Sequence, residues 1–486
     1  MTLSRRGFLL ATGGACAAFA GCDRLERGLG VRVPEGAFLA PSAGELDFAQ
    51  HVLARCSFGP RPGDRAALLA LDGDPHAAAR AWLERQLAPA SIDDEQSERA
   101  ARRCDSIDAP LGELYEYKPA VLLRELTAAA LLRATYSQRQ LFEVLVEFWT
   151  DHFNIDSSKA ECAWLEAGHD REVIRKHALG RFSELLQASA FSPAMLWYLD
   201  GRANVKRTPE ERPNENFARE LLELHTLGVH GGYTQTDVME AARCLSGWTV
   251  RDRHGFKKAQ VEFHSDAHDD GRKCVLGVEI PSGGGERDVQ ILLDALARHP
   301  ATARHIATKL CTRFLADLPP AAAVADVAAA FEASAGDIPS TLRALFSRPE
   351  FEQLRGVKLK RPFHYLVSIL RASAAQTDGG PALASYLARM GQAPFQYPTP
   401  DGYPEEASAW QGALFWRWKL GFALANGRVA GTRIDAARLV ERAGGADALL
   451  AHLLGRTPRE RERELFLDEG EPRLGLVFAS PAFQRC

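Results

Sequence analysis

Residues 138–153 read QRQLFEVLVEFWTDHF, and the spacing of the apolar side chains in this stretch decides the fold class. The apolar positions, three and four residues apart, are Leu141, Phe142, Leu145, Val146, Trp149 and Phe153. This interval places them along one side of an α-helix. We therefore predict a helix that buries this face in a core.

The same periodicity recurs through most of the chain. It predicts helices over 119–135, 214–227, 300–316, 320–335, 358–374, 408–426 and 433–454. Strand patterns are scarce, with the best at 248–250, 260–263 and 275–280. The predicted fold class is mostly α, a large multi-helical body with a small β-hairpin or ribbon around 248–282. We expect the basic residues of 358–361 to flank a helix start in solvent.

Composition narrows the function classes. The 486 residues are 46% hydrophobic and 25% charged, which is ordinary for a globular protein. The net charge of -4 offers no basic excess for a nucleic-acid partner. There is no apolar run long enough to span a bilayer, and the nine cysteines include no Cys-x-x-Cys. We therefore expect neither a membrane-spanning helix nor a zinc ribbon.

The N-terminus has the pattern of an export signal. Arg5 and Arg6 precede a short, soft apolar run, which is typical of a twin-arginine signal and predicts a periplasmic protein. Cys22 ends a lipoprotein-like box, so we expect either a lipid anchor there or simple cleavage. We divide the chain into the signal (1–22), a tether (23–42) and a helical body (43–486). A sub-boundary near 285 is the alternative to a single body.

One predicted helix face carries polar residues that a core does not need. Asn216, Glu220 and Glu223 recur at i, i+4 and i+7, with His225 on the flank. Two carboxylates and an amide on one face can hold a divalent metal or transfer protons. The alternative is a solvated face on which Glu215 pairs with an arginine four residues on.

The richest supply of ligand-type side chains lies between 264 and 273. His268 and Asp269 belong to it, but Gly277 stands where a calcium loop needs a bidentate Glu, so an EF-hand is excluded. Histidine mixed with carboxylate suits zinc, iron or manganese. The alternative is a charged surface hairpin. Asp237 is expected to cap a helix unless it is a ligand or catalytic acid.

Two further groups have a structural and a functional interpretation. His152 continues the apolar stripe of its helix, so it is either a hydrogen-bonded core residue or a metal ligand. The aromatic residues between 397 and 418, Tyr403 among them, either pack in the core or line a groove for a sugar or peptide.

Several of these segments resemble the domain-of-unknown-function 1800 family. The motifs that carry the resemblance are Asn214 to Val229, Gly231-Gly232-Tyr233-Thr234-Gln235, Asp237-Val238, Gly247-Trp248, Trp149-x-x-His152-Phe153-Asn154, His268-Asp269-x-Gly271-x-Lys273, His299-Pro300-Ala301-Thr302-Ala303, Lys309-Leu310 and Pro400-Asp401-Gly402-Tyr403-Pro404 with Trp410. The resemblance covers roughly residues 45 to 484. It implies a large helical bacterial protein, often exported by the twin-arginine route and often encoded beside a sulfatase-like exported family. It implies no activity.

The leading hypothesis is an exported, metal-dependent enzyme, with an oxidoreductase favoured over a hydrolase. The predicted roles are catalysis by Glu220, Glu223 and Asp237, cofactor contact by Asn216 and Tyr403, and metal ligation by His152, His225, His268 and Asp269. The cofactor would be zinc, iron or manganese. Carboxyls one turn apart on one helix lie too close for a metal-free glycosidase pair.

The alternative hypothesis is a non-catalytic binding or escort protein. Such a protein would recognise a cell-surface polymer or a co-exported partner, with a sulfatase-like protein as the implied candidate. The aromatic loop would then matter more than the acidic helix face.

Overall fold

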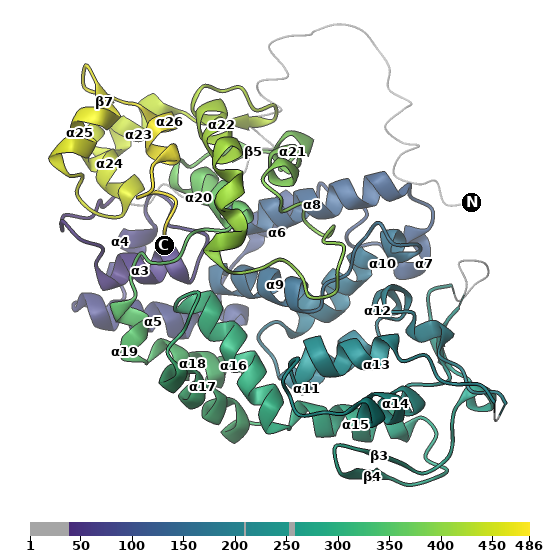
Figure 1. The fold of residues 1–486 in the computed structure, drawn as a ribbon. Helices are drawn as coiled ribbons and strands as arrows, with labels where there is room; N and C mark the ends of the chain where they lie inside the picture. Colours follow the sequence, from purple (N-terminus) through teal and green to yellow (C-terminus); the bar gives the residue numbers. More distant parts are fainter. Residues whose placement is uncertain (1–37, 209, 252–257) are drawn as a thin grey trace, which may run out of the picture.

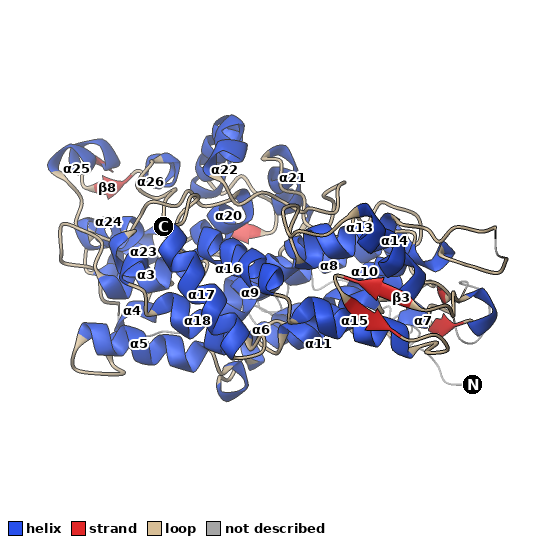
Figure 2. Cartoon of the chain, turned by 60° about the horizontal axis from the view of Figure 1, so that its bottom comes forward, coloured by secondary structure: helices blue, strands red, loops and turns tan. Residues whose placement is uncertain are grey.

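The computed structural model describes residues 38–208, 210–251 and 258–486. The predicted signal and Cys22 lie outside the described residues, as does most of the tether. Helices dominate the described chain, with strands confined to two-stranded antiparallel sheets (Figure 2). The mostly-α fold class is confirmed.

The first part of the chain is helical, and α8 and α9 are its two longest helices. Its elements are α3(Phe48–Arg55), α4(Asp64–Leu69), α5(Pro75–Gln86), η1(Pro89–Ser91), α6(Glu95–Ala101), α7(Leu111–Leu114), α8(Pro119–Tyr136) and α9(Gln140–His152). α8 begins with a proline in its first turn, where the missing N–H costs nothing. α9 buries Leu141, Leu145 and Trp149, so the predicted apolar face of this helix is confirmed.

The middle part carries the hairpins β1–β2 and β3–β4. Its elements are α10(Cys162–His169), η2(Asp170–Arg175), α11(Phe182–Ala190), α12(Pro193–Tyr198), η3(Gly201–Ala203), α13(Asn216–Glu220), η4(Leu221–Thr226), α14(Gln235–Cys244), β1(Trp248–Val250), β2(Val261–Phe263), η5(Ser265–Ala267), β3(Lys273–Val275), β4(Val278–Ile280) and α15(Arg287–Ala297). The predicted ribbon is two hairpins, β1–β2 and β3–β4. The second packs against α14.

The remaining elements complete the body. They are α16(Pro300–Phe314), α17(Ala321–Ala333), α18(Ile338–Phe346), α19(Pro349–Gln353), α20(Pro362–Ala372), β5(Gln376–Thr377), α21(Pro381–Arg389), η6(Ala407–Ala413), α22(Leu414–Ala425), β6(Thr432–Arg433), α23(Ala436–Ala443), α24(Ala446–Leu454), α25(Glu460–Phe466), β7(Leu467–Asp468), β8(Glu471–Pro472) and α26(Leu474–Ala479). Among the described residues no helix is both long and apolar enough to cross a membrane.

One hydrophobic cluster joins the two ends of the described chain. It contains Phe48 of α3 and Phe483 near the C-terminus, together with residues of most helices between them. α3 lies beside the C-terminal residues (Figure 1), and Arg55 donates a hydrogen bond to the backbone oxygen of Cys486 at 2.6 Å. The last described residues therefore pack against α3, the first helix of the described chain.

The expectation that Lys358, Lys360 and Arg361 sit in solvent is wrong. All three are buried, with exposed fractions of 4, 7 and 2%. Each is satisfied by internal acceptors, because Lys358 pairs with Asp317, Lys360 donates to a backbone carbonyl, and Arg361 meets carboxylates. Charge in a sequence does not reveal partners that come from distant segments.

Candidate functional site

Three elements bring a cluster of nitrogen bases together in the middle of the fold. His152 is the last residue of α9, His225 lies in η4, and His305 and Lys309 lie one turn apart on α16. α16 packs against η4, and α9 and α16 both lie in the centre of Figure 1. We call these four residues the histidine–lysine cluster.

Short polar contacts connect the members of this cluster. Lys309 Nζ lies 3.0 Å from His152 Nδ1. His152 Nε2 lies 3.2 Å from the backbone oxygen of His225, and His305 Nε2 lies 3.1 Å from that of Leu224. The ring of His152 is 6.2 Å from that of His225 and 6.1 Å from that of His305. Thus η4 supplies carbonyl acceptors to two of the imidazoles.

A π-helical turn explains why His225 points inward. The predicted helix over 214–227 is α13 followed by η4, where Leu227 N–H donates to the Leu222 oxygen, five residues back. The wider turn shifts side chains around the axis relative to an α-helix. His225 is 1% exposed, while Glu220 and Glu223 are only half-buried. Such turns are frequent at functional sites.

The surroundings of the cluster favour uncharged bases. Burial lowers the pKa of His152 well below its usual range, the pKa of His225 to about 3 and that of His305 to about 4. Burial also lowers the pKa of Lys309 to about 8, although nearby carboxylates oppose the shift. A lysine amine with such a pKa can both accept and donate a proton near neutral pH.

The carboxylates of Glu220, Glu223 and Asp401 lie near one another. Burial raises the pKa of Glu220, and the neighbouring charges of Glu223 and Asp401 raise it further. Glu223 lies 3.6 Å from Arg219, which also pairs with Glu215 as the solvated-face interpretation predicted. Of these three acids, Asp401 also acts on the charge of Lys309, and Glu223 is partly neutralised by Arg219.

The motif at 400–404 is fixed directly against the end of α9. Asn154 Nδ2 donates to the backbone oxygens of Tyr397 and Thr399 at 3.0 and 2.8 Å. Gly402 approaches so closely that a Cβ on it would lie 1.9 Å from the backbone oxygen of Asp151. Two segments that are 250 residues apart therefore meet next to His152.

Tyr403 is a structural anchor of this loop. Its hydroxyl donates to the backbone oxygen of Ala393 at 2.7 Å. Its ring lies 4.5 Å from that of Tyr397 and 6.1 Å from that of Trp410. Tyr403 thus packs against neighbouring rings, and with Tyr397 and Trp410 it also lines a hollow of about 330 Å³. No contact of Tyr403 leads to the histidine–lysine cluster within the described residues.

A buried network of ion pairs holds the helix α9, which ends in His152. Arg361 lies 2.6 Å from both Glu147 and Asp151, and Arg313 lies 2.6 Å from Glu147 and 3.1 Å from Glu405. Burial raises the pKa of Asp151 to about 6. Because Glu147 and Asp151 lie on α9, the network fixes the turn that ends in His152.

Asn216 and Asp237 lie in the first turns of two helices and form structural hydrogen bonds there. Asn216 Nδ2 donates to the backbone oxygen of Leu199 at 3.0 Å. Asp237 forms a capping box with Thr234, the N-cap residue, and accepts from the N–H of Leu276 at 2.7 Å. Asp237 therefore ties α14 to the β3–β4 hairpin, in agreement with the expected capping role.

His268 and Asp269 lie in a separate polar group. His268 Nδ1 donates to the Ser246 carbonyl at 2.8 Å and its Nε2 lies 3.1 Å from Asp288, which also binds buried Lys273 at 2.5 Å. Two hydrogen bonds of 2.9 Å join Asp269 to Arg243, and these bonds lower the pKa of Asp269 to about 2. Both residues are already satisfied by partners outside the histidine–lysine cluster.

Sequence reasoning did not single out His169 and Glu166, which extend the buried polar interior. His169 Nδ1 lies 2.8 Å from the Ser192 hydroxyl. A positive charge on His169 would lower the pKa of His225. Burial lowers the pKa of His169 to about 3 and raises that of Glu166 well above its usual range. Both precede η2, the other π-helical turn among the described residues.

The predicted ligands do not gather around one point. Within residues 38–208, 210–251 and 258–486, no three side chains of the His, Cys, Asp or Glu types are close enough to hold a metal ion. His152, Asp269 and His268 use their nitrogens or oxygens in the contacts above. Among the four predicted metal ligands, all of which lie in the described chain, only His225 has a buried ring nitrogen, Nε2, without a hydrogen-bond partner.

Fold and site together define a mostly helical protein with a histidine–lysine cluster at its centre, in which His152 and His225 are buried and His305 and Lys309 are half-buried. A family model described as a protein of unknown function (DUF1800) matches residues 51–485, so the chain belongs to that family. No curated protein and no solved structure matches it. The cluster joins three of the family-like motifs, those around His152, Lys309 and His225.

Proposed function

We propose that this protein is an exported enzyme in which Lys309, held in place by His152, transfers protons to and from the substrate. The observation that carries the proposal is the 3.0 Å contact between Lys309 Nζ and His152 Nδ1. Proton transfer is most efficient when the pKa of the acting group lies near the working pH. Burial provides this for Lys309, whose pKa falls to about 8.

The neighbouring groups suit such a role. Glu220 has a raised pKa through burial and through the charge of Glu223, so it can act as a second proton donor. His305 lies one turn from Lys309 on the same helix. The charge of Lys309 helps to keep His305 neutral by lowering its pKa. Export rests on the paired arginines of the N-terminus, which are outside the described residues.

Lysine labelling across a pH series tests the proposed chemistry. A small amine-reactive reagent is applied between pH 6 and 11, and mass spectrometry reports the extent of modification of Lys309, with exposed Lys419 as an internal reference. We expect Lys309 to titrate near pH 8. A titration of Lys309 with an ordinary lysine midpoint of about 10.4 would remove the basis of the proposal.

Turnover is tested with a matched pair of variants. Ester, phosphoester, glycoside and redox-dye substrates are offered to the wild type, to Lys309→Met and to Lys419→Met. We expect one substrate class to be consumed by the wild type and by Lys419→Met, with a loss of about a hundredfold or more in Lys309→Met. Equal rates in all three would contradict a role for Lys309.

A metal-dependent form of this enzyme is supported by one observation. The buried Nε2 of His225 has no partner in the described chain, and neutral imidazole is a common metal ligand. Elemental analysis of the exported protein tests it, with His225→Gln as the variant. Stoichiometric zinc, iron or manganese that is lost in the variant supports this form, and metal content that does not change in the variant counts against it.

The second candidate is an escort or binding protein, and the exposed aromatic face of α22 favours it. Phe415, Trp418 and Phe422 are 57, 50 and 41% exposed. Exposed apolar groups gathered on one face are typical of a protein interface, here for a co-exported partner such as a sulfatase-like protein. Loss of a co-purifying partner in Phe415→Ser/Trp418→Ser, but not in Lys309→Met, would favour the escort.

A further inference from the structure

A large cavity lies apart from the histidine–lysine cluster. It has a volume of about 880 Å³ and lies between α3, α24, the segment 352–356 and the C-terminal residues. Pockets for small molecules usually measure about 300–1,000 Å³. No member of the histidine–lysine cluster is among its lining residues, so it is a second site, independent of the proposed active site.

The lining of this cavity is rich in positive charge. Its cationic side chains are Arg355, Lys360, Arg456, Arg459 and Arg485, and its carboxylates are Glu45 and Glu352. Arg355 is paired with Glu352, and Arg456 with Glu462. Within the described residues no ion pair is formed by Lys360, Arg459 or Arg485. The cavity therefore offers three cations with capacity for an external anion.

Lys360 is the innermost of these cations. It is 7% exposed, and its Nζ donates to the backbone oxygen of Phe483 at 2.7 Å. Burial lowers its pKa to about 8, against an opposing influence from Cys486. An ammonium group with a carbonyl as its hydrogen-bond acceptor is stabilised further when a negative charge approaches it.

Two buried guanidinium groups behind the wall add to the positive potential. Arg55 donates to the backbone oxygens of Phe314 and Leu315 at 2.8 and 2.9 Å, and to that of Cys486, which lines the cavity. Arg417 donates to the backbone oxygen of Lys360 at 2.7 Å. In a concave, partly desolvated site, charges of one sign reinforce each other and concentrate the opposite ion.

We propose that this cavity binds an anionic ligand through phosphate or carboxylate groups, with Lys360 at the inner wall and Arg459 and Arg485 at the rim. Arg459 and Arg485 are exposed, so they can meet the ligand first. Guanidinium groups match the planar, two-oxygen geometry of both anions. The volume admits a ligand with more than one such group.

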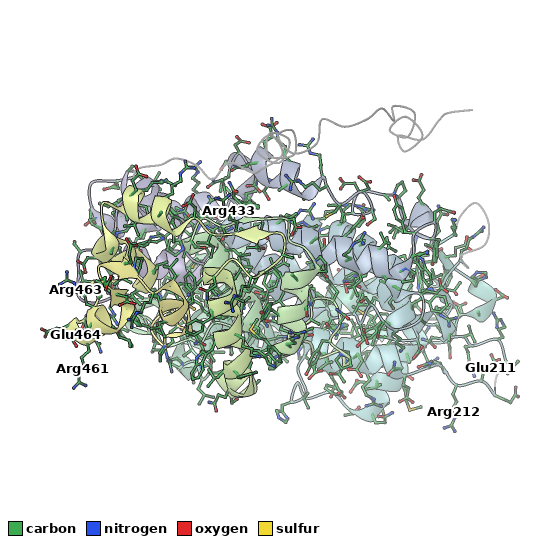
Figure 3. The ribbon with its side chains drawn as sticks, turned by 90° about the horizontal axis from the view of Figure 1, so that it is seen from above. Glu211, Arg212, Arg433, Arg461, Arg463 and Glu464 are labelled. Carbon is green, nitrogen blue, oxygen red and sulfur yellow. The ribbon has the colours of Figure 1, made fainter. Side chains whose placement is uncertain are left out.

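Arg461 provides a matched control. It follows Arg459 by two residues at the start of α25, is exposed, and does not line the cavity. Figure 3 shows it at the edge of the molecule near Arg463 and Glu464. The change Arg461→Gln therefore removes the same charge from the same helix without touching the site.

The experiment measures binding of inorganic phosphate and of citrate by calorimetry, with sodium chloride keeping the ionic strength constant. We expect at least one of the two anions to bind the wild type and Arg461→Gln equally. Arg459→Gln and Lys360→Met should each weaken that binding about tenfold, because each loses one charge-assisted contact. Binding of phosphate alone identifies a phosphate ligand, and binding of citrate alone identifies a carboxylate ligand.

Two outcomes would overturn the proposal. One is the absence of binding by both anions in the wild type. The other is an equal loss in Arg459→Gln and Arg461→Gln, which would indicate non-specific attraction to a basic surface. Arg459→Gln is an exposed change, so it decides the question even where Lys360→Met fails to fold.

Discussion

His225 illustrates how burial controls the charge of one residue. Its pKa of about 3 is far below the usual 6.5. Between these values the unfolded chain binds a proton at this position and the folded chain does not. Protonation therefore favours the unfolded state as the pH falls from about 6.5 towards 3. The stabilising contribution of a neutral His225 is largest above pH 6.5.

This linkage gives a quantitative prediction for His225→Gln. Removing one titrating group should flatten the dependence of the unfolding free energy on pH by about 1.4 kcal/mol per pH unit between pH 6 and 4. Urea unfolding of wild type and variant at several pH values measures it. Parallel pH profiles for the two proteins would show that His225 is already charged in the native state.

Asp237 is the residue for which a structural and a catalytic role are most easily separated. Its capping box and its bond to Leu276 predict that Asp237→Ala lowers the unfolding free energy by about 1–2 kcal/mol. The control is Thr236→Ala, an exposed neighbour. If Asp237→Ala instead kept its unfolding free energy but lost turnover, Asp237 would have a catalytic role.

At the scale of elements, the end of α9 depends on the loop at 398–404. Gly402 has a φ of 75°, which favours glycine, and it also packs on the backbone of Asp151. Two penalties thus act at one position, an unfavourable backbone conformation and a steric clash. Only the clash would displace α9 and the cluster.

We predict that Gly402→Ala lowers stability by about 3 kcal/mol or more and shifts the labelling midpoint of Lys309. Gly427→Ala separates the two penalties, because Gly427 has a φ of 63° but nothing within 4 Å of a Cβ. That control should cost about 1 kcal/mol and leave Lys309 unchanged. Equal losses in the two variants would mean that the contact with Asp151 carries no weight.

At the scale of the whole molecule, the main hydrophobic cluster, which extends from α3 to the C-terminal residues, predicts cooperative unfolding. Arg55 connects three distant parts of the chain, because it donates to the C-terminal end of α16, to Leu354 and to Cys486. Lysine keeps the charge but lacks the fork of donors that reaches several acceptors at once. A substitution of Arg55 should therefore destabilise the whole molecule.

We predict that Arg55→Lys lowers the unfolding free energy by about 2 kcal/mol or more and that the transition remains single. Denaturant unfolding followed by tryptophan fluorescence and by circular dichroism measures both properties. Arg85→Lys on α5 is the exposed control. Two separate transitions in the wild type would contradict a continuous core.

The sequence predicted those features that depend on neighbours along the chain. Periodicity located the helices at 119–135, 138–153 and 300–316 to within a few residues, and the hairpins near 248–282. It did not predict the π-turn that turns His225 away from Glu220, since i+4 and i+5 bonding leave similar sequence patterns. It also did not separate His268 and Asp269 from His152, because the same residue types serve as ligands and as internal hydrogen-bond partners.

The sequence by itself determined the family, the helical class and the residue types available for chemistry, since these follow from local pattern and composition. Only the tertiary structure decided which of these residues meet. His152 and Lys309 are 157 positions apart, yet their nitrogens lie 3.0 Å from each other. Such contacts, and the pKa values they create, come from the burial of segments packed together across the core, which no local pattern encodes.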